Sequence, residues 1–282
     1  IISRRPDWDK FPGADYTMAV DTVMPDGKML QIGTAHMLGD HFSRTYDITF
    51  EDANGERRYA YQTCYGISER SIAATISVHG DDRGLVLPPE VAPIAIVIVP
   101  IIVGKRREEV LSAAATVEKD LRNAGFTVKL DDRDMRPGAK YYHWEMRGVP
   151  LRVEIGPRDI DANTVVAVTR LGRKITLDRR GVVEGVISVL AEFGEELSQT
   201  ARQAMADRIA VTDTLEETAE AVKRGVAVVH WCGSKECAEK IEAATDASIL
   251  GSDIRSDLIT VSAGPCIACG GKGTSTLVAR TY

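Results

Sequence analysis

Four of the five cysteines lie near the end of the chain, in two closely spaced pairs. Cys232 and Cys237 have four residues between them, Cys266 and Cys269 have two, and 28 residues separate the pairs. Such clustering is typical of a metal site in a reducing compartment more than of a disulfide framework. Two close pairs joined by a loop can supply four thiolates to zinc, and this ion would be structural because no coordination position stays open. Four reduced cysteines without a metal, or an adventitious disulfide, are the alternatives.

A second chemical feature is the run QTCYGISERSIAATISVHGDDRGLVLPPEVAP, residues 62–93. It combines a short strand, a helix and a proline-rich loop. We expect the helix at about residues 67–79, with the Ser68 hydroxyl accepting from an early backbone N–H. Ile72 and Ile76, one turn apart, are expected to face a core.

Arg70 lies on the other side of this helix, beside small residues at spacings of three, four and seven. A cation in that position suits a ligand that approaches closely and carries negative charge. The alternative is an arginine on a solvated helix face, which spacing alone favours.

Gln31, Thr34 and His36 lie in the segment LQIGTAHMLGD. Gln31 and the alternate positions after it share one face of a regular strand, which Gly33 can disturb. A glutamine, a hydroxyl and an imidazole together can line a polar pocket. Taken singly, a histidine such as His36 is more often a core or surface residue.

The run from Lys140 to Asp159, KYYHWEMRGVPLRVEIGPRD, mixes aromatic side chains, arginines and carboxylates. Arginines can bind phosphates and base edges, carboxylates can accept from base amino groups, and aromatic rings can stack on unpaired bases. The alternative is an ordinary surface with ion pairs.

The elements that position these residues lie in a chain of 282 residues, which is long enough for two domains or a few modules. A hydrophobic content of 44% is ordinary for a globular protein. The net charge of −6 argues against coating nucleic acid by bulk electrostatics but permits a local basic patch. No apolar run approaches the ~18 residues that span a membrane, and no signal peptide is visible. Because the chain begins with Ile1 and not with Met, we expect it to belong to a longer protein.

Three modules are predicted, over residues 1–93, 94–200 and 201–282. The first reads as an antiparallel meander with strands over 16–23, 28–34, 42–51 and 57–64. In the second, an apolar run typical of a strand buried on both faces precedes alternating helices and strands, which predicts a mixed α/β sheet. The third has a helix over 215–224 and a strand over 226–231 before the cysteines. The predicted fold class is α/β (α+β).

The segments LQIGTAHMLGDHF, QTCYGISERSIAATISVHGDDRGLVLPPEVAP and DDRDMRPGAKYYHWEMRGVPLRVEIGPRD together resemble prolyl-tRNA synthetases of the archaeal and eukaryotic type. The resemblance covers essentially the whole chain. It implies part of an antiparallel-sheet class II catalytic core with its third signature motif, a mixed α/β anticodon-binding domain and a small C-terminal α/β zinc domain. It also implies ATP-dependent attachment of L-proline to tRNA(Pro) through prolyl-adenylate, with Mg²⁺ and a structural Zn²⁺, by a cytoplasmic homodimer.

Residue roles follow from the positions that match the family's motifs. Arg70 would hold the γ-phosphate of ATP and oppose its charge during transfer, and Ser68 would touch the nucleotide. Gln31 and Thr34 match positions that contact ATP, Gln31 also near the magnesium ion. His36 matches a position in the proline pocket.

The resemblance also assigns four residues to the anticodon, at Glu145, Arg152, Arg158 and Asp159. These match the positions that read its two guanines, which agrees with their chemistry. Arginine donates to guanine O6 and N7, and carboxylates accept from guanine N1 and N2. The last residue, Tyr282, is expected to fold back toward the catalytic domain.

The family's first and second motifs are absent from these 282 residues, as is the Thr-x-Glu segment that grips proline. We therefore expect these residues alone to bind ATP poorly and to make no adenylate. Two alternatives remain: a non-catalytic class II paralogue that binds tRNA or a protein partner, and a stand-alone zinc-containing RNA-binding module.

Overall fold

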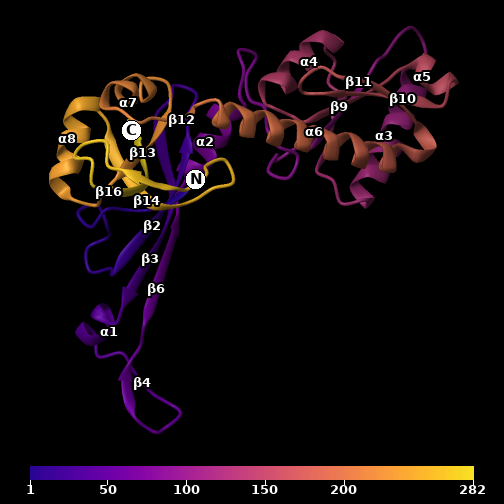
Figure 1. The fold of residues 1–282 in the computed structure, drawn as a ribbon. Helices are drawn as coiled ribbons and strands as arrows, with labels where there is room; N and C mark the ends of the chain where they lie inside the picture. The colour runs from indigo at the N-terminus through magenta and orange to yellow at the C-terminus, as the bar shows by residue number, and fades with distance from the viewer. The chain divides into compact units, whose positions relative to one another are not determined.

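The structure, a computed structural model, describes all 282 residues, which form two compact units (Figure 1). The first unit comprises residues 1–77 and 203–282, and the second comprises residues 78–202. The fold is mixed α/β with mostly antiparallel strand pairs, as predicted. None of the helices combines the length and apolar character needed to cross a membrane.

The first unit is built on a nine-stranded sheet, to which both ends of the chain contribute. Its central path has the order β12-β13-β16-β14-β1-β2-β3-β6, and β15 pairs with β16. The bounds are β1 (Ile2–Arg4), β2 (Tyr16–Val23), β3 (Met29–Gly39), β6 (Gln62–Ile67), β12 (Ile209–Val211), β13 (Val226–Trp231), β14 (Ser248–Arg255), β15 (Ala263–Pro265) and β16 (Lys272–Ala279). Because β1 pairs with β14, the first and third predicted modules share one sheet. The predicted domain boundaries, over residues 1–93, 94–200 and 201–282, stay a prediction.

Strand β13 is apolar throughout because both of its faces are buried. Ala227, Val229 and Trp231 pack against α7 (Leu215–Ala221) and α8 (Lys235–Thr245) in one core cluster. Val226 and Val228 face a second cluster, which contains Met29 of β3. The predicted strand over residues 226–231 has the observed bounds.

The hairpin of β3 and β6 carries an excursion at its far end, with α1 (His41–Thr45), β4 (Thr49–Glu51) and β5 (Arg57–Tyr59) (Figure 1). The strand predicted over residues 42–51 is therefore wrong in its first half. Local polar contacts favour the helical turn there, because Asp40 accepts from the Arg44 guanidinium at 2.6 Å and its carbonyl accepts from the Ser43 hydroxyl.

Helix α2 (Arg70–His79) begins later than predicted. The Ser68 hydroxyl does not cap it; instead the Ser68 carbonyl oxygen accepts from the backbone N–H of Ser71 at 3.1 Å. The predicted core face is also wrong, because Ile72 and Ile76 are 62% and 38% exposed. Ala74 is the residue of α2 that the chain buries, so the surrounding elements cover a different face from the one that periodicity selects.

The second unit contains a five-stranded sheet in the order β11-β10-β9-β7-β8, in which β7 is parallel to both neighbours. Its strands are β7 (Ile96–Pro100), β8 (Val128–Leu130), β9 (Leu151–Ile155), β10 (Thr164–Thr169) and β11 (Lys174–Asp178). Its helices are α3 (Arg107–Asn123), α4 (Pro137–Met146), α5 (Pro157–Asp161) and the start of α6 (Val182–Ala206). Ile96 and Ile98 pack in the main core, whereas Val97 and Val99 pack against Trp144 on the opposite face. The prediction of a strand buried on both faces is confirmed.

Candidate functional site

A β-bulge in β3 brings Gln31 onto the same sheet face as Thr34 and His36. Asp21 of β2 pairs with Gln31, and the residue before it, Val20, pairs with Gly33. Ile32 of β3 is therefore the extra residue. One extra residue shifts the alternation of side chains by one step. In a regular strand, Gln31 would point away from the other two. The predicted disturbance near Gly33 is therefore what assembles the group.

Gln31, Thr34, Ser68 and Arg70 all line one pocket of about 520 Å³ in the first unit. β3 supplies the first two, the end of β6 leads into Ser68, and α2 begins at Arg70. Arg70 is exposed, and its guanidinium forms no ion pair and no hydrogen bond with the protein. The pocket thus offers an amide, two hydroxyls and the unpaired Arg70 guanidinium, and Glu69 adds a carboxylate to its lining. The guanidinium and the neutral polar groups can bind a phosphate-bearing ligand.

His36 lies on the same face but outside that pocket. Its Nδ1 lies 2.9 Å from the Thr17 hydroxyl, and its ring is 4.8 Å from the ring of Phe11, centroid to centroid. Cys64 of β6 is the residue paired with His36 across the sheet. No sequence pattern selects Phe11 or Thr17, because their contacts with His36 depend on the pairing of β2 with β3.

In the second unit, Glu145 and Arg152 line one cavity of about 280 Å³. Glu145 lies near the end of α4 and its side chain is 17% exposed. Arg152 of β9 donates from Nε to Glu154 at 2.9 Å, and its guanidinium lies over the Tyr141 ring at 3.9 Å. A carboxylate and a stacked guanidinium therefore line the same cavity, and both groups can hydrogen-bond to a base edge.

Arg158 and Asp159 do not line this cavity, although they were predicted to act with Glu145 and Arg152. They lie in α5, where the Asp159 carboxylate accepts from the backbone N–H of Gly156 at 2.8 Å. Burial and the Glu154 carboxylate raise the pKa of Tyr141, and the Asp159 charge adds to this effect.

The sequence reasoning missed Lys174, which lines the same cavity. In the sheet, Val168 of β10 pairs with Arg152 on one side and with Lys174 of β11 on the other. Directly paired residues point to the same face of a sheet. The side chains of Arg152 and Lys174 therefore lie on one face, on either side of Val168. The register of the β10–β11 hairpin is the signal that reveals Lys174.

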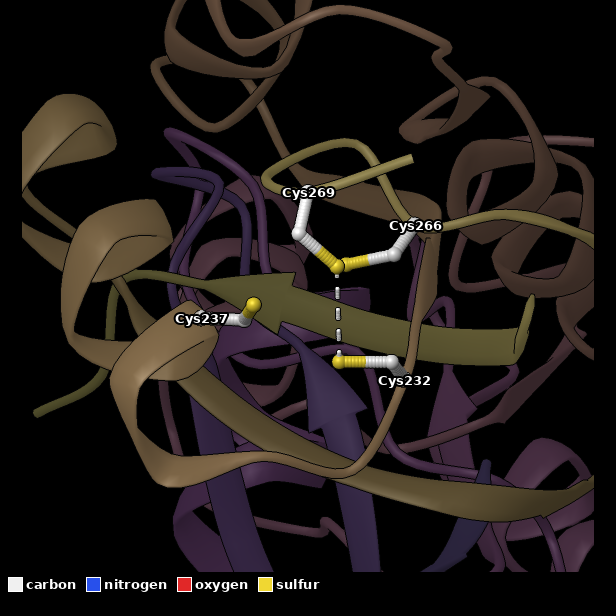
Figure 2. Close-up of side chains that lie close together, drawn as sticks. All are labelled: Cys232, Cys237, Cys266 and Cys269. Atoms are coloured by element: carbon white, nitrogen blue, oxygen red, sulfur yellow. Dashed lines mark hydrogen bonds between the residues drawn. The ribbon is translucent and has the colours of Figure 1, made fainter. Parts of the chain in front are cut away.

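The four cysteines of the predicted metal site converge in the first unit (Figure 2). Their Sγ atoms all lie within 4.8 Å of one another, and those of Cys232 and Cys269 are 3.9 Å apart. A tetrahedral zinc site with Zn–S bonds of ~2.3 Å requires sulfur atoms ~3.8 Å apart. All four thiols are free in this structure. The donor set therefore fits a metal ion held by four thiolates.

Rigid elements hold each of these thiols in place. Cys232 follows the buried strand β13, and Cys237 lies in the first turn of α8, where its backbone N–H donates to the Ser234 hydroxyl. Cys266 and Cys269 flank a tight turn, in which the backbone N–H of Gly270 donates to the Cys266 carbonyl at 2.7 Å. Gly270 has a φ of +75°, a conformation that favours glycine.

The Cys266 sulfur already has an environment that stabilises a thiolate. Burial raises the pKa of this thiol, but backbone N–H groups of Ala268, Cys232 and Cys269 outweigh that effect and lower the pKa to about 7. Amides that point at sulfur are the arrangement expected around a thiolate ligand. They come from residues 232, 268 and 269, whereas Gly270 shapes the turn.

Tyr282 lies against the first segment of the chain, in agreement with the expected return of the C-terminus. The Lys28 ammonium is 4.9 Å from the centre of its ring, and the neighbouring Thr281 forms a β-bridge with Met29.

Comparison with known proteins assigns both parts of the chain. Residues 95–189 match the family model described as "Anticodon binding domain", and residues 215–282 match "Prolyl-tRNA synthetase, C-terminal". The first match contains the cavity with Glu145 and Arg152, and the second contains all four clustered cysteines.

Curated relatives are similar over the whole chain. A proline–tRNA ligase of Methanoculleus marisnigri is 82% identical, and one of Methanocorpusculum labreanum is 55% identical, each over 100% of this chain and 59% of the relative. A solved prolyl-tRNA synthetase from Cryptosporidium parvum, complexed with L-proline and AMP, is 33% identical with a TM-score of 0.89 and covers 100% of this chain and 61% of its own. The chain thus spans about three fifths of the length of these relatives, and it belongs to the prolyl-tRNA synthetase family.

Proposed function

We propose that this chain is part of a proline–tRNA ligase, which uses ATP to attach L-proline to tRNA(Pro) through prolyl-adenylate. The observation that carries the proposal is the convergence of Gln31, Thr34, Ser68 and Arg70 on one pocket. A protein that only binds tRNA has no need of these residues. The unpaired Arg70 in particular argues against a non-catalytic paralogue and against a stand-alone RNA-binding module.

In this pocket, Arg70 would hold the γ-phosphate and oppose the negative charge that spreads over it during transfer. Its guanidinium is available for this because no carboxylate of the chain pairs with it. Thr34 and Ser68 would contact the nucleotide, and Gln31 would do so beside Mg²⁺. A magnesium ion would neutralise phosphate charge when bound.

His36 would form part of the proline pocket, next to the ATP residues on the same sheet face. Thr17 holds its Nδ1 and Phe11 packs on its ring, so the imidazole is fixed in orientation. The ring of Phe11 would give the apolar proline side chain a surface to contact.

The second unit would read the anticodon of tRNA(Pro). Glu145 would accept from the N1 and N2 groups of a guanine, and Arg152 would donate to O6 or N7. Arg158 and Asp159 would contact the anticodon from α5, outside the cavity that holds the first two.

The cysteine cluster would hold one structural Zn²⁺, since all four ligand positions come from the chain. The protein would act in the cytoplasm. At full length it would form a homodimer.

Amino-acid-dependent ATP–pyrophosphate exchange tests the activity on the full-length ligase that carries this chain. Proline should stimulate exchange, and alanine and cysteine should not. Arg70→Ala should lower the rate by roughly 10²-fold or more, the usual effect of removing a charge-stabilising donor, and Arg70→Lys should lower it less. Arg57→Ala is a matched control, because Arg57 is also exposed and unpaired but lies at the tip of the β3–β6 hairpin.

The proposal fails if proline does not stimulate exchange, or if Arg70→Ala is as active as Arg57→Ala. The 282 residues alone should show no exchange. Robust proline-dependent exchange by these residues would contradict the expectation that motifs outside this sequence complete the site.

A further inference from the structure

The segment that leads into the second sheet, residues 81–87, lies along the end of α4. The backbone N–H of Leu85 donates to the Met146 carbonyl at 3.1 Å, and that of Leu87 donates to the Gly148 carbonyl at 3.4 Å. Glycine is required on both sides of this contact. A Cβ on Gly84 would lie 2.5 Å from the Met146 oxygen, and a Cβ on Gly148 would lie 2.7 Å from Leu85 Cβ. We call residues 81–87 the connecting segment.

Arg170 links the connecting segment to α4 through hydrogen bonds to both. Its Nε is shared between the carbonyl oxygens of Leu85 and Glu145, each at 2.8 Å. Its two terminal amino groups donate to the Asp81 carboxylate at 2.6 and 3.1 Å. The Arg170 side chain is only 1% exposed, so this frame is rigid.

Within this frame, Arg83 reaches the carboxylate of Glu145. Its Nη1 lies 2.7 Å from Glu145 Oε1, while its Nη2 and backbone N–H both donate to the Asp81 carboxylate. No protein group donates to Glu145 Oε2, and both residues line the cavity that also contains Arg152. One carboxylate oxygen is therefore held by Arg83, and the other remains available to a ligand.

We infer that Arg83 is a positioning residue for guanine recognition: it holds the Glu145 side chain in the orientation in which its carboxylate accepts from the guanine N1–H and N2–H groups. The inference rests on the proposed anticodon-reading role of Glu145. Guanine presents two adjacent donors, and a carboxylate that is held in one rotamer can accept from both. Arg83 lies outside residues 95–189, which match the anticodon-binding family model, so the connecting segment supplies part of the specificity.

Binding of anticodon stem–loops to the 282-residue chain tests this inference. The ligands are the tRNA(Pro) stem–loop and versions with inosine, which lacks the N2 amino group, at either guanine position. The measured quantity is the ratio of dissociation constants, inosine over guanine, at fixed salt concentration. The wild-type chain should prefer guanine at one position, and Glu145→Gln should remove that preference.

Arg83→Ala should lower the guanine preference by about tenfold, in the range expected when a base-reading contact is lost. Arg83→Lys should restore part of it, because lysine retains the charge but not the planar fork. In the Glu145→Gln background, Arg83→Ala should cause no further loss of preference, since Arg83 acts through Glu145. A loss of stability alone would weaken guanine and inosine binding equally.

Arg147→Ala is the matched control, because Arg147 is an exposed arginine at the end of the same helix whose side chain contacts only His143. Arg147→Ala should leave the ratio of dissociation constants, inosine over guanine, unchanged. The inference is overturned if Arg83→Ala also leaves this ratio unchanged, or if its effect on the ratio persists in the Glu145→Gln background. If Glu145→Gln removes the preference and Arg83→Ala does not alter it, the inference alone fails. If the wild-type chain shows no preference, the anticodon-reading proposal fails and this inference fails with it.

Discussion

Replacing Asp81 by asparagine tests the ion pair that holds the connecting segment in the second unit. The Asp81 carboxylate accepts two hydrogen bonds from Arg170, whose side chain is 1% exposed. These bonds lower the pKa of Asp81 to about 2; burial opposes this shift, and the Arg83 backbone N–H supports it. Asp81→Asn preserves the volume but removes the charge, which leaves the buried guanidinium without its counterion.

The size of the effect follows from the pKa. A fall from 3.8 to about 2 corresponds to at most ~2.5 kcal/mol. Because the Asp81 side chain is 33% exposed, solvent screening reduces this value. We expect the free energy of unfolding of the second unit to fall by ~1–2 kcal/mol at neutral pH.

The pH dependence has a definite sign. The pKa of Asp81 is lower in the folded state than in the unfolded state, so its stabilisation is complete above about 3.8 and is lost as the pH falls toward about 2. Asp81→Asn lacks this contribution at every pH. The difference in stability between wild type and variant should therefore shrink over that interval.

The assay is urea-induced unfolding of the chain, followed by hydrogen exchange in peptides from β9 and β10, which reports on the second unit alone. Asp82→Asn is the control, because Asp82 is exposed and forms no ion pair. The reasoning is refuted if Asp81→Asn destabilises the unit no more than Asp82→Asn, or if the difference at neutral pH persists unchanged at pH 2.

Three further predictions concern the metal site, the anticodon site and the core. Metal analysis of the purified chain should find about one zinc, and Cys232→Ser should lower both zinc content and the stability of the first unit, because metal binding contributes to folding; absence of zinc with unchanged stability would contradict this. Arg152→Ala should weaken discrimination at one guanine by roughly 1–3 kcal/mol in stem–loop binding, whereas an equal loss for all anticodons would mark a backbone contact. Phe193→Ala, which removes a fully buried ring packed on Val86 and Leu197, should destabilise the second unit by ~3–5 kcal/mol in urea titrations; Ile187→Ala, at a position 51% exposed on the same helix, should have a much smaller effect.

Sequence patterns succeeded where burial on both faces leaves little ambiguity. The bounds of β2 and β13 were predicted to the residue, because alternating or apolar runs between turn residues have few other structures available. The clustered cysteines were likewise predicted from spacing, and the structure brings their sulfur atoms together.

The failures have tertiary causes. Periodicity cannot detect the bulge at Ile32, because only the pairing of β3 with β2 reveals the extra residue. Ile72 on α2 was assigned to a core, yet these residues leave it exposed, so an apolar stripe predicts a buried face without identifying the element that covers it. Arg83 has no local signal for its role, since its partner Glu145 lies far away in the sequence.

Aminoacylation of tRNA(Pro) with labelled proline by the full-length ligase that carries this chain tests the central claim most directly. The claim is that these residues form the ATP-site wall and the anticodon reader of a proline–tRNA ligase. The account predicts that proline is attached to tRNA(Pro), that Arg70→Ala abolishes attachment, and that Arg57→Ala does not. Failure to attach proline, attachment of a different amino acid, or full activity of Arg70→Ala would contradict it.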